Sequence, residues 1–296
     1  MERKIFGRAA VAALSLGVCA LVSYGSAEPA AKAAPHRAIA ARRGVRPVAS
    51  GGPAAVVAVS PTLRLQEDLA SLGYLPVRWN GQSFYYAAAD VPPQIASLFQ
   101  PGVDTQLLRS ALMTFAADHG LLATGSATPA LWRALGGDLA AGRTDPHAFT
   151  YVYVSTASPE RISVWSPSGV LSESLTNTGV AGAATPDGTY PVYLRLTYQV
   201  MRGKSLNGTP YADPVHWISY FHGGDAVHGF VRQSYGYPQS LGCVEVPTGV
   251  AQRIFDELQI GTLVTVSTAP FSLTPAPEPT ASSTAASLAR RVAAVR

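Results

Sequence analysis

The segment from His228 to Glu245 holds residues whose types and spacing could support chemistry. Cys243 is one of only two cysteines in the 296-residue chain, and His228 lies 15 residues before it. A thiolate is a strong nucleophile, and a histidine within hydrogen-bond reach can take the thiol proton and later return one to a leaving group. Gly242 would let a substrate approach the backbone beside the sulfur. The segment therefore predicts nucleophilic thiol chemistry, with Cys243 as nucleophile and His228 as general base and acid.

The other cysteine, Cys19, falls in an N-terminal segment with the layout of an export signal. A basic start is followed by an apolar run over residues 9–22 and by small residues before position 28. This run of about 14 residues is shorter than the roughly 20 that span a bilayer. We therefore expect residues 1–27 to be a signal peptide, with an uncleaved anchor as the alternative. The secreted protein would then carry one free thiol and no stable membrane span.

Composition sets the ends of the chain apart from its middle. Residues 28–58 are rich in Ala, Pro and Arg and predict an extended linker, whereas the Ala, Ser, Thr and Pro of residues 269–296 predict a disordered tail. Residues 51–268 contain 11 Lys and Arg against 15 Asp and Glu, although the whole chain has a net charge of +4. Because binding to phosphates needs a basic face, we expect no nucleic-acid partner.

Apolar residues at helical spacing mark residues 59–138 as the first folded domain. Leucines three or four positions apart that stop at a glycine predict one helix. A second helix is expected over residues 105–119, and Thr128-Pro129 would open a third, because proline suits the first helical turn. Together they predict a small three-helix bundle with a Leu, Phe and Trp core. The residues of the first helix pattern are Leu63, Leu65, Leu69, Leu72 and Gly73.

This pattern resembles the small helical peptidoglycan-binding domain that is attached to many cell-wall enzymes. The resemblance rests on core leucines and turn glycines, among them Leu65-Gln66, Leu72-Gly73-Tyr74 and Gly120-Leu121. It implies that the domain holds the protein on the glycan. Residues 78–103 are an insertion relative to that family, and their aromatic side chains could stack on sugar rings or fill the core. These side chains are Trp79, Phe84, Tyr85 and Tyr86.

The period changes to that of strands in the second domain, residues 149–268. Short runs of β-branched and aromatic residues are separated by turns that contain proline and glycine, and a longer run covers residues 190–200. A strand is expected over 216–221, a helix over 247–258 and a closing strand over 262–266. Many strands with one late helix predict a mixed β-sandwich, so the whole chain is expected to be an α+β multidomain protein.

The second domain resembles the YkuD-like L,D-transpeptidase catalytic domain. Three landmarks carry the resemblance in the family's order: Thr185-Pro186-Asp187-Gly188, His228-Gly229 and Ser240-Leu241-Gly242-Cys243-Val244. The resemblance implies an enzyme that cleaves the L,D peptide bond of a peptidoglycan tetrapeptide stem and transfers the acyl group to an amine on a neighbouring stem. It also implies action in the cell wall or periplasm, with stem peptides and glycan as partners and with no cofactor or metal.

The resemblance assigns roles within these landmarks. Cys243 is expected to form the acyl-enzyme, and the backbone carbonyl of Gly229 to orient the imidazole of His228. The amides around Gly242 and Cys243 are candidates for stabilising the oxyanion. Three further residues are candidates for substrate binding, namely Ser240, Tyr220 and Arg232.

Two positions depart from the family's pattern. Leu241 stands where members often have histidine, which leaves His228 as the candidate base close to the motif. Glu245 stands where they often have arginine, and it could receive an amine-bearing acceptor or pair with a basic side chain. Binding of a substrate carboxylate would then fall to other basic residues of the second domain, which are Arg195, Arg202, Lys204 and Arg232.

Other functions stay open as alternatives. His216, His222 and His228 recur every six residues and could join Cys243 in a zinc site, although Gly223-Gly224 interrupts the strand that would align them. A serine hydrolase is disfavoured because the chain lacks a Gly-x-Ser-x-Gly elbow. Water in place of the amine would give an L,D-carboxypeptidase, and a chain without catalysis would be a cell-wall-binding protein.

Overall fold

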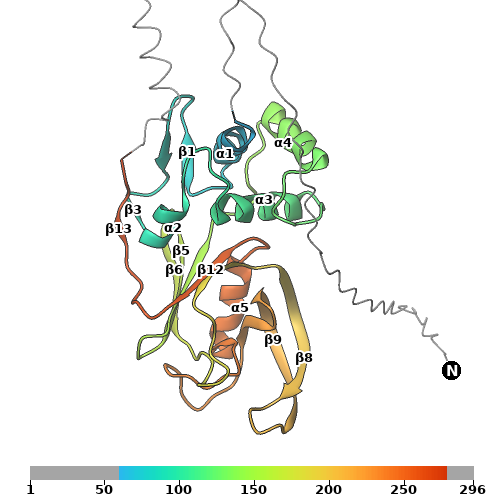
Figure 1. Cartoon of the computed structure of the whole chain (residues 1–296), viewed down its shortest axis with the longest axis vertical. Helices are drawn as coiled ribbons and strands as arrows, with labels where there is room; N and C mark the ends of the chain where they lie inside the picture. The colour runs from blue at the N-terminus through green and yellow to red at the C-terminus, as the bar shows by residue number, and fades with distance from the viewer. Residues whose placement is uncertain (1–59, 279–296) are drawn as a thin grey trace, which may run out of the picture. The chain divides into compact units, whose positions relative to one another are not determined.

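The structure, a computed structural model, describes residues 60–278 (Figure 1). The predicted signal peptide, the whole of the predicted linker, and residues 279–296 of the predicted tail lie outside this part. Helices dominate up to residue 141, and two mixed sheets follow from residue 151. None of the helices in the described part combines the length and apolarity needed to cross a membrane.

The helix-rich part contains the three predicted helices. Two of them begin at Pro61 and Pro129, and the Thr128 hydroxyl caps the latter by accepting a hydrogen bond from the N–H of Leu131 at 3.2 Å. Thr105 caps the middle helix in the same way. The elements of this part are α1 (Pro61–Leu72), β1 (Val77–Trp79), β2 (Phe84–Tyr86), β3 (Asp90–Val91), α2 (Pro93–Leu98), α3 (Gln106–Asp118) and α4 (Pro129–Ala141).

The insertion has structure of its own, which the helical periodicity did not predict. Strands β1 and β2 form an antiparallel hairpin, and the short helix α2 follows. Phe84 is buried, Trp79 and Tyr86 pack against the core beside it, and Tyr85 is exposed. The expected three-helix bundle is therefore extended by a hairpin and a short helix, because aromatic side chains of the insertion add to the core.

Two mixed sheets and one helix make up the β-rich part. One sheet has the order β6-β5-β4-β12-β7, with β4 and β12 parallel, and the other has the order β11-β10-β9-β8, with β10 and β11 parallel. The elements are β4 (Tyr151–Ser155), β5 (Arg161–Ser166), β6 (Gly169–Leu175), β7 (Gly188–Pro191), β8 (Leu194–Lys204), β9 (Pro210–His222), β10 (Asp225–Gly229), β11 (Val244–Val246), α5 (Thr248–Glu257), β12 (Leu263–Ser267) and β13 (Thr274–Pro275).

Strand β4 shows that the five-stranded sheet is covered on both faces. Val152 and Val154 lie in a core shared with α5 and the four-stranded sheet. Tyr151 and Tyr153, which alternate with them, lie with Trp165 in the core of the helix-rich part. All five side chains are buried. The helices and this sheet therefore share one hydrophobic core.

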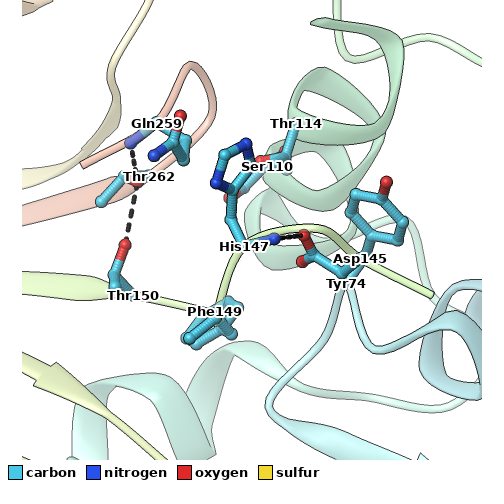
Figure 2. Close-up of a pocket in the computed structure, with 10 residues that line it drawn as sticks. Tyr74, Ser110, Thr114, Asp145, His147, Phe149, Thr150, Gln259 and Thr262 are labelled. Carbon is cyan, nitrogen blue, oxygen red and sulfur yellow. Dashed lines mark hydrogen bonds between the residues drawn. The ribbon is translucent and has the colours of Figure 1, made fainter. Parts of the chain in front are cut away.

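Helix α3 lies against the turn that precedes β12. The Ser110 hydroxyl donates to the Gly261 carbonyl at 2.5 Å, and Gln106 Nε2 donates to the Thr189 carbonyl at 2.6 Å. Gly261 has a φ of +94°, and a Cβ there would lie 2.4 Å from Thr114 Oγ1, so glycine is needed for this close approach. Beside the contact lies a cavity of about 20 Å³, room for about one water molecule (Figure 2).

Residues 269–276, which we call the C-terminal strap, run back from the β-rich part to the insertion. The Tyr153 hydroxyl donates to the Ala269 carbonyl at 3.0 Å, and the Tyr153 and Phe271 ring centroids are 5.6 Å apart. Strand β13 pairs antiparallel with β3, beside which it runs in Figure 1. The predicted disordered tail therefore does not begin at residue 269, because Phe271 and Ala276 pack against the shared core.

Candidate active site

The four-stranded sheet presents one face to an open cleft of about 590 Å³. The long hairpin of β8 and β9, strand β10 and the segment that ends in β11 all contribute side chains to it. Cys243, His228 and Glu245 line this cleft. Strands β10 and β11 are parallel neighbours in which His228 pairs with Glu245, so residues far apart in the sequence meet on one sheet face.

Cys243 lies at the end of the irregular segment before β11. Its Sγ is 3.9 Å from the carbonyl oxygen of Gly224, in the turn between β9 and β10. Burial raises the pKa of the thiol to about 12; a backbone hydrogen bond from Ala226 acts against the rise, and the carboxylates of Asp225 and Glu245 add to it. The resting protein therefore carries a protonated thiol at neutral pH.

His228 is buried on β10, and a hydrogen bond to the backbone holds its ring. Nδ1 lies 3.1 Å from the carbonyl oxygen of Gly229. A carbonyl only accepts hydrogen bonds, so Nδ1 carries the proton and Nε2 keeps a lone pair that can accept one. Burial lowers the pKa of His228, which favours the neutral ring. Cys243 and His228 are thus a neutral thiol and a neutral imidazole at rest.

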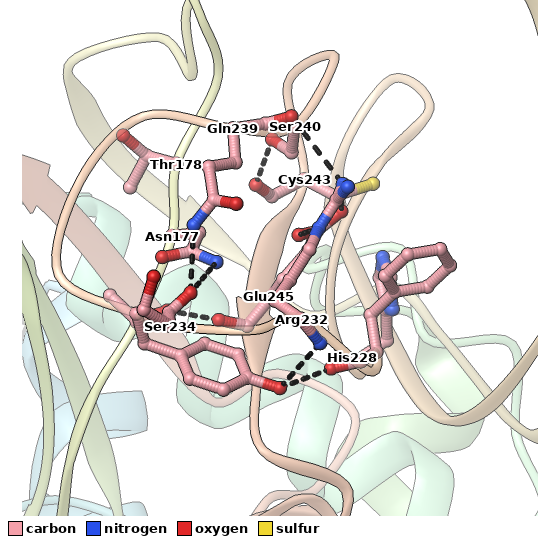
Figure 3. A network of polar contacts seen from close by, with 12 residues as sticks. Asn177, Thr178, His228, Arg232, Ser234, Gln239, Ser240, Cys243 and Glu245 are labelled. Atoms are coloured by element: carbon pink, nitrogen blue, oxygen red, sulfur yellow. Dashed lines mark hydrogen bonds and ion pairs between the residues drawn. The ribbon is translucent and has the colours of Figure 1, made fainter.

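The segment from Ser240 to Cys243 is fixed by hydrogen bonds (Figure 3). Ser240 Oγ donates to the Cys243 carbonyl at 2.5 Å and accepts from the Gly242 N–H at 3.2 Å. Thr185, in the predicted Thr-Pro-Asp-Gly turn, donates its hydroxyl to the Gly242 carbonyl at 2.8 Å. Ser240 borders the cleft but is 3% exposed, so its hydroxyl braces the segment that carries the thiol.

Behind this segment lies a buried carboxylate that the sequence motifs did not indicate. Glu160 accepts hydrogen bonds from the N–H and the hydroxyl of Thr178, both at 2.7 Å. The Thr178 carbonyl in turn accepts from the N–H groups of Gln239 and Ser240, at 2.8 and 3.0 Å. Glu160 therefore holds the Cys243 segment in place through Thr178.

Arg232 and Glu245 form an ion pair at the cleft. Arg232 Nε and Nη2 each lie 2.7 Å from a different carboxylate oxygen of Glu245, and the guanidinium carbon lies 4.6 Å from the centre of the Phe230 ring. Glu245 is 4% exposed. Of the two roles considered for Glu245, pairing with a basic side chain is the one present in this structure.

The other candidate substrate-binding residues divide between two places. Tyr220 borders the cleft, and its hydroxyl donates to Gln199 Oε1 at 2.8 Å. Arg202 also lines the cleft. Arg195 instead packs on α5, where its guanidinium carbon lies 4.1 Å from the centre of the Phe255 ring and its Nη2 donates a hydrogen bond to the Phe255 carbonyl. Arg202 is therefore a cleft arginine outside the Arg232–Glu245 pair.

The three evenly spaced histidines have different partners. The rings of His216 and Tyr198 lie 4.9 Å apart, His222 Nδ1 is 3.1 Å from Asp225 Oδ2, and His228 contacts the backbone of the following glycine. Within the described part of the chain, no group of three or more His, Cys, Asp or Glu side chains is arranged to hold a metal ion.

The residues that line the cleft lie within a segment that matches a known family. Residues 150–266 match the family described as the YkuD L,D-transpeptidase catalytic domain. None of the curated proteins matches this chain.

Several solved structures are similar to parts of the chain. The catalytic domain of the E. faecium L,D-transpeptidase is 24% identical over 41% of this chain and 98% of its own, with a TM-score of 0.37. An L,D-transpeptidase (Yku) from Stackebrandtia nassauensis is 19% identical over 57% of this chain and 81% of its own, with a TM-score of 0.33. An L,D-transpeptidase from Mycobacterium smegmatis is 22% identical over 40% of this chain and 58% of its own, with a TM-score of 0.36.

The family match covers the cleft as a whole. It runs from the residue before β4 almost to the end of β12, and every residue that lines the cleft falls within it. The family consists of enzymes that act in peptidoglycan crosslinking outside the cytoplasm. Residues 150–266, about two fifths of the chain, match the YkuD L,D-transpeptidase catalytic domain.

Proposed function

We propose that this protein is a peptidoglycan L,D-transpeptidase that works through an acyl-enzyme on Cys243. The observation that carries the proposal is the shared cleft of an L,D-transpeptidase domain, where the thiol lies with an imidazole held through Nδ1. This tautomer leaves His228 Nε2 as the ring atom able to accept the thiol proton.

In the first half-reaction, the sulfur attacks the carbonyl carbon of the L,D peptide bond in a tetrapeptide stem. Because the pKa of the thiol is raised to about 12, His228 Nε2 takes its proton as the C–S bond forms, and no preformed thiolate is required. The same proton then passes to the nitrogen of the leaving D-residue as the C–N bond breaks. The products are a thioester on Cys243 and a released amine.

The oxygen that becomes negative in this step needs hydrogen-bond donors. The N–H of Gly242 is engaged by Ser240 Oγ at 3.2 Å, which leaves the N–H of Cys243 as the nearer backbone candidate. The bonds from Ser240 and Thr185 fix the segment before the substrate arrives, so little reorganisation accompanies the developing charge.

In the second half-reaction, an amine on a neighbouring stem attacks the thioester carbonyl. A C–N bond forms, the C–S bond breaks, and the thiol is regenerated with a proton returned through His228. Water in place of the amine would release an acid and make the enzyme an L,D-carboxypeptidase. The identity of the product separates these two outcomes.

We further propose that the helix-rich part binds peptidoglycan and that the protein acts in the cell wall or periplasm after export. The resemblance of its helices to peptidoglycan-binding domains supports this, as does the exposed ring of Tyr85 on the insertion, 41% accessible and able to stack on a sugar. Binding to polymer would raise the effective concentration of stems near the cleft.

The intact mass of the protein after exposure to a disaccharide-tetrapeptide tests the catalytic proposal, with Cys243→Ala as the matched control. We expect the unmodified protein to gain the acyl mass at Cys243 and the variant to gain none. Absence of an adduct, of tripeptide and of crosslinked product would contradict the proposal. Addition of an amine acceptor then distinguishes a crosslinked product from a released acid.

Sedimentation with insoluble peptidoglycan tests the binding proposal. We expect the protein to cosediment and Tyr85→Ala to bind severalfold more weakly, because stacking on a sugar is lost. Leu122→Ala is the matched control, since Leu122 is an exposed apolar residue of the same part, 84% accessible. No cosedimentation would contradict binding by the helix-rich part, and equal loss in both variants would contradict a specific role for Tyr85.

A further inference from the structure

The cleft holds a carboxylate that the proposed chemistry does not use. Glu245 is neutralised by Arg232 through two hydrogen bonds of 2.7 Å. Asp225 is different, because the side chain that contacts it is the imidazole of His222, 3.1 Å from Oδ2, which can donate a hydrogen bond without carrying a charge. Asp225 therefore places a negative charge in the cleft that no guanidinium pair offsets.

This carboxylate lies directly beside the nucleophile's backbone. Asp225 follows Gly224, whose carbonyl oxygen is 3.9 Å from Cys243 Sγ. Its Oδ1 is so close to Gly242 that a Cβ added there would lie 2.2 Å away, and Gly242 has a φ of +120°. The Asp225 side chain is 19% exposed. One carboxylate oxygen thus meets His222 and the other meets the residue before the cysteine.

A negative charge at this place opposes formation of the nucleophile. Asp225 and Glu245 both contribute to the raised pKa of the Cys243 thiol, but only Glu245 has an arginine partner. Asp225 therefore does not act by activating the thiol. What a fixed carboxylate in a cleft favours is the approach of a cation, and it does so more strongly where the site is partly shielded from water.

We propose that Asp225 binds the ammonium group of the acceptor and so favours amines over water in the second half-reaction. The inference rests on the proposed function, because it concerns the acyl-enzyme on Cys243. An aliphatic amine arrives protonated at neutral pH, and a carboxylate is its natural hydrogen-bond partner. Asp225 is a cleft carboxylate that adjoins the cysteine and lacks an arginine partner.

The acyl group passes from Cys243 to the amine in the following steps. The ammonium ion at Asp225 gives one proton to solvent, and the lone pair of the neutral amine attacks the thioester carbonyl. The C–N bond forms and the C–S bond breaks. The second proton of the attacking nitrogen passes through His228 to sulfur, which leaves an amide and the free thiol. Asp225 itself forms no covalent bond.

Partitioning of the preformed acyl-enzyme tests this inference. The acylated protein is mixed with either a primary alkylamine, which is protonated at neutral pH, or hydroxylamine, which is uncharged. For Asp225→Asn we expect the amide-to-acid ratio with the alkylamine to fall about fivefold to tenfold, as for loss of a partly buried charge pair. The hydroxamate-to-acid ratio should stay within about twofold, because an uncharged nucleophile gains little from the carboxylate.

Two further variants decide whether the effect belongs to this residue. Asp256→Asn removes the same charge from the exposed face of α5 and should leave both ratios unchanged. Asp213→Asn removes a cleft carboxylate on β9 and should have a smaller effect than Asp225→Asn. Equal losses at positions 213 and 225, or equal losses with both nucleophiles in Asp225→Asn, would overturn the proposal.

If Asp225→Asn does not fold, two measurements on the unmodified protein still test the proposal. Added salt should lower the amide-to-acid ratio with the alkylamine and leave the hydroxamate-to-acid ratio unchanged, because salt screens the attraction of a charged acceptor. The alkylammonium ion should also slow alkylation of Cys243 by iodoacetamide, a readout that needs no acyl-enzyme. If salt leaves the amide-to-acid ratio unchanged and the alkylammonium ion leaves the alkylation rate unchanged, the role of Asp225 is overturned. If the alkylammonium ion protects the thiol but no acyl-enzyme ever forms, only the proposed function is overturned.

Discussion

The two sheets of the β-rich part differ in what lies on their faces. In the five-stranded sheet, the valines of β4 face α5 and the tyrosines face the helix-rich part, so both faces are buried. In the four-stranded sheet, one face joins the valine core and the other is open as the cleft. The side chains that line the cleft come from β8 to β11 and their connections. The five-stranded sheet therefore contributes to packing on both faces, whereas the four-stranded sheet leaves one face free for the residues of the candidate site.

The two sheets are nevertheless linked at one point. Glu160 lies in the turn between β4 and β5 of the buried sheet, and through Thr178 it supports Gln239 and Ser240 of the segment that carries the thiol. The buried sheet thus sets the position of the Cys243 segment without contributing to the cleft. Substitutions on the buried faces should accordingly affect mainly stability, whereas substitutions on the cleft face can affect activity, stability or both.

The largest expected effect is on the open face. His228→Gln removes the proposed base while keeping a polar side chain, so we expect the rate of acyl-enzyme formation to fall about 10² to 10⁴-fold. The midpoint of thermal unfolding should change little in comparison. Rapid-quench mass measurement of the acyl-enzyme provides the rate. Retention of the full rate would show that another group takes the thiol proton.

On the buried aromatic face, Trp165→Ala should cost about 3–5 kcal/mol of unfolding free energy, because a large fully buried side chain leaves a cavity. Urea titration followed by circular dichroism measures it. Val170→Ala on the neighbouring strand is the control, since this substitution of a side chain that is 43% exposed should change the unfolding free energy little.

Because the helices share this core, the unmodified chain should unfold in one transition. Two separated transitions would contradict the shared core.

At the edge of the cleft, Glu245→Gln should lower the unfolding free energy by about 2–3 kcal/mol, because the Arg232 guanidinium loses its charged partner. This loss is smaller than that expected for a fully buried pair, because the Arg232 side chain is 29% exposed. The double variant Arg232→Leu/Glu245→Leu leaves neither charge unpaired, so its unfolding free energy should fall less than that of Glu245→Gln. A larger loss in the double variant would show that the pair is a net stabiliser.

The strap joins the buried sheet to the insertion, so its removal tests that connection. Ending the chain after residue 268 deletes Phe271 and strand β13 and should lower the unfolding free energy by about 2 kcal/mol, the order expected for a partly buried aromatic ring. Thermal unfolding of the shortened chain measures the loss. An unchanged midpoint would show that the strap contacts contribute nothing to stability.

The smallest effect concerns pH at the junction of helices and sheet. Burial raises the pKa of Asp145 to about 7 (Figure 2). The folded state therefore binds this proton more tightly than the unfolded state, so the contribution to stability is lost as pH rises from about 4 through 7. Asp145→Asn should flatten this decline and raise the unfolding free energy by about 1 kcal/mol above pH 7, a modest gain because the side chain is partly exposed. An unchanged pH profile would contradict the assignment.

Local sequence signals predicted the helices well. A threonine before a proline, or a leucine run that ends at a glycine, defines a helix boundary within a few residues, and Thr128-Pro129 and Gly73 lie where these rules place them. The strap was missed because the composition of residues 269–296 predicts disorder, whereas Phe271 is held by Tyr153, more than a hundred residues away. Composition carries no information about such a partner.

The candidate site shows the same division. Cys243 and His228 could be selected because a lone thiol and a nearby histidine have distinctive chemistry, and both line the cleft. Glu160 and Asp225 could not be selected, because an acidic residue has many ordinary uses and their contacts depend on turns that only the folded chain brings together. Pairing of Glu245 with a basic side chain was one of two options, and the geometry was needed to choose it and to identify Arg232 as the partner.

The tyrosine face of β4 has a practical consequence for work on the catalytic domain alone. If residues 149–268 were produced without the helices, Tyr151, Tyr153 and Trp165 would lose their cover and form a continuous apolar patch on the sheet. Such patches promote self-association. A shortened enzyme that aggregates or forms dimers through this face would say nothing about wall binding, so the helices should be kept when activity is assayed.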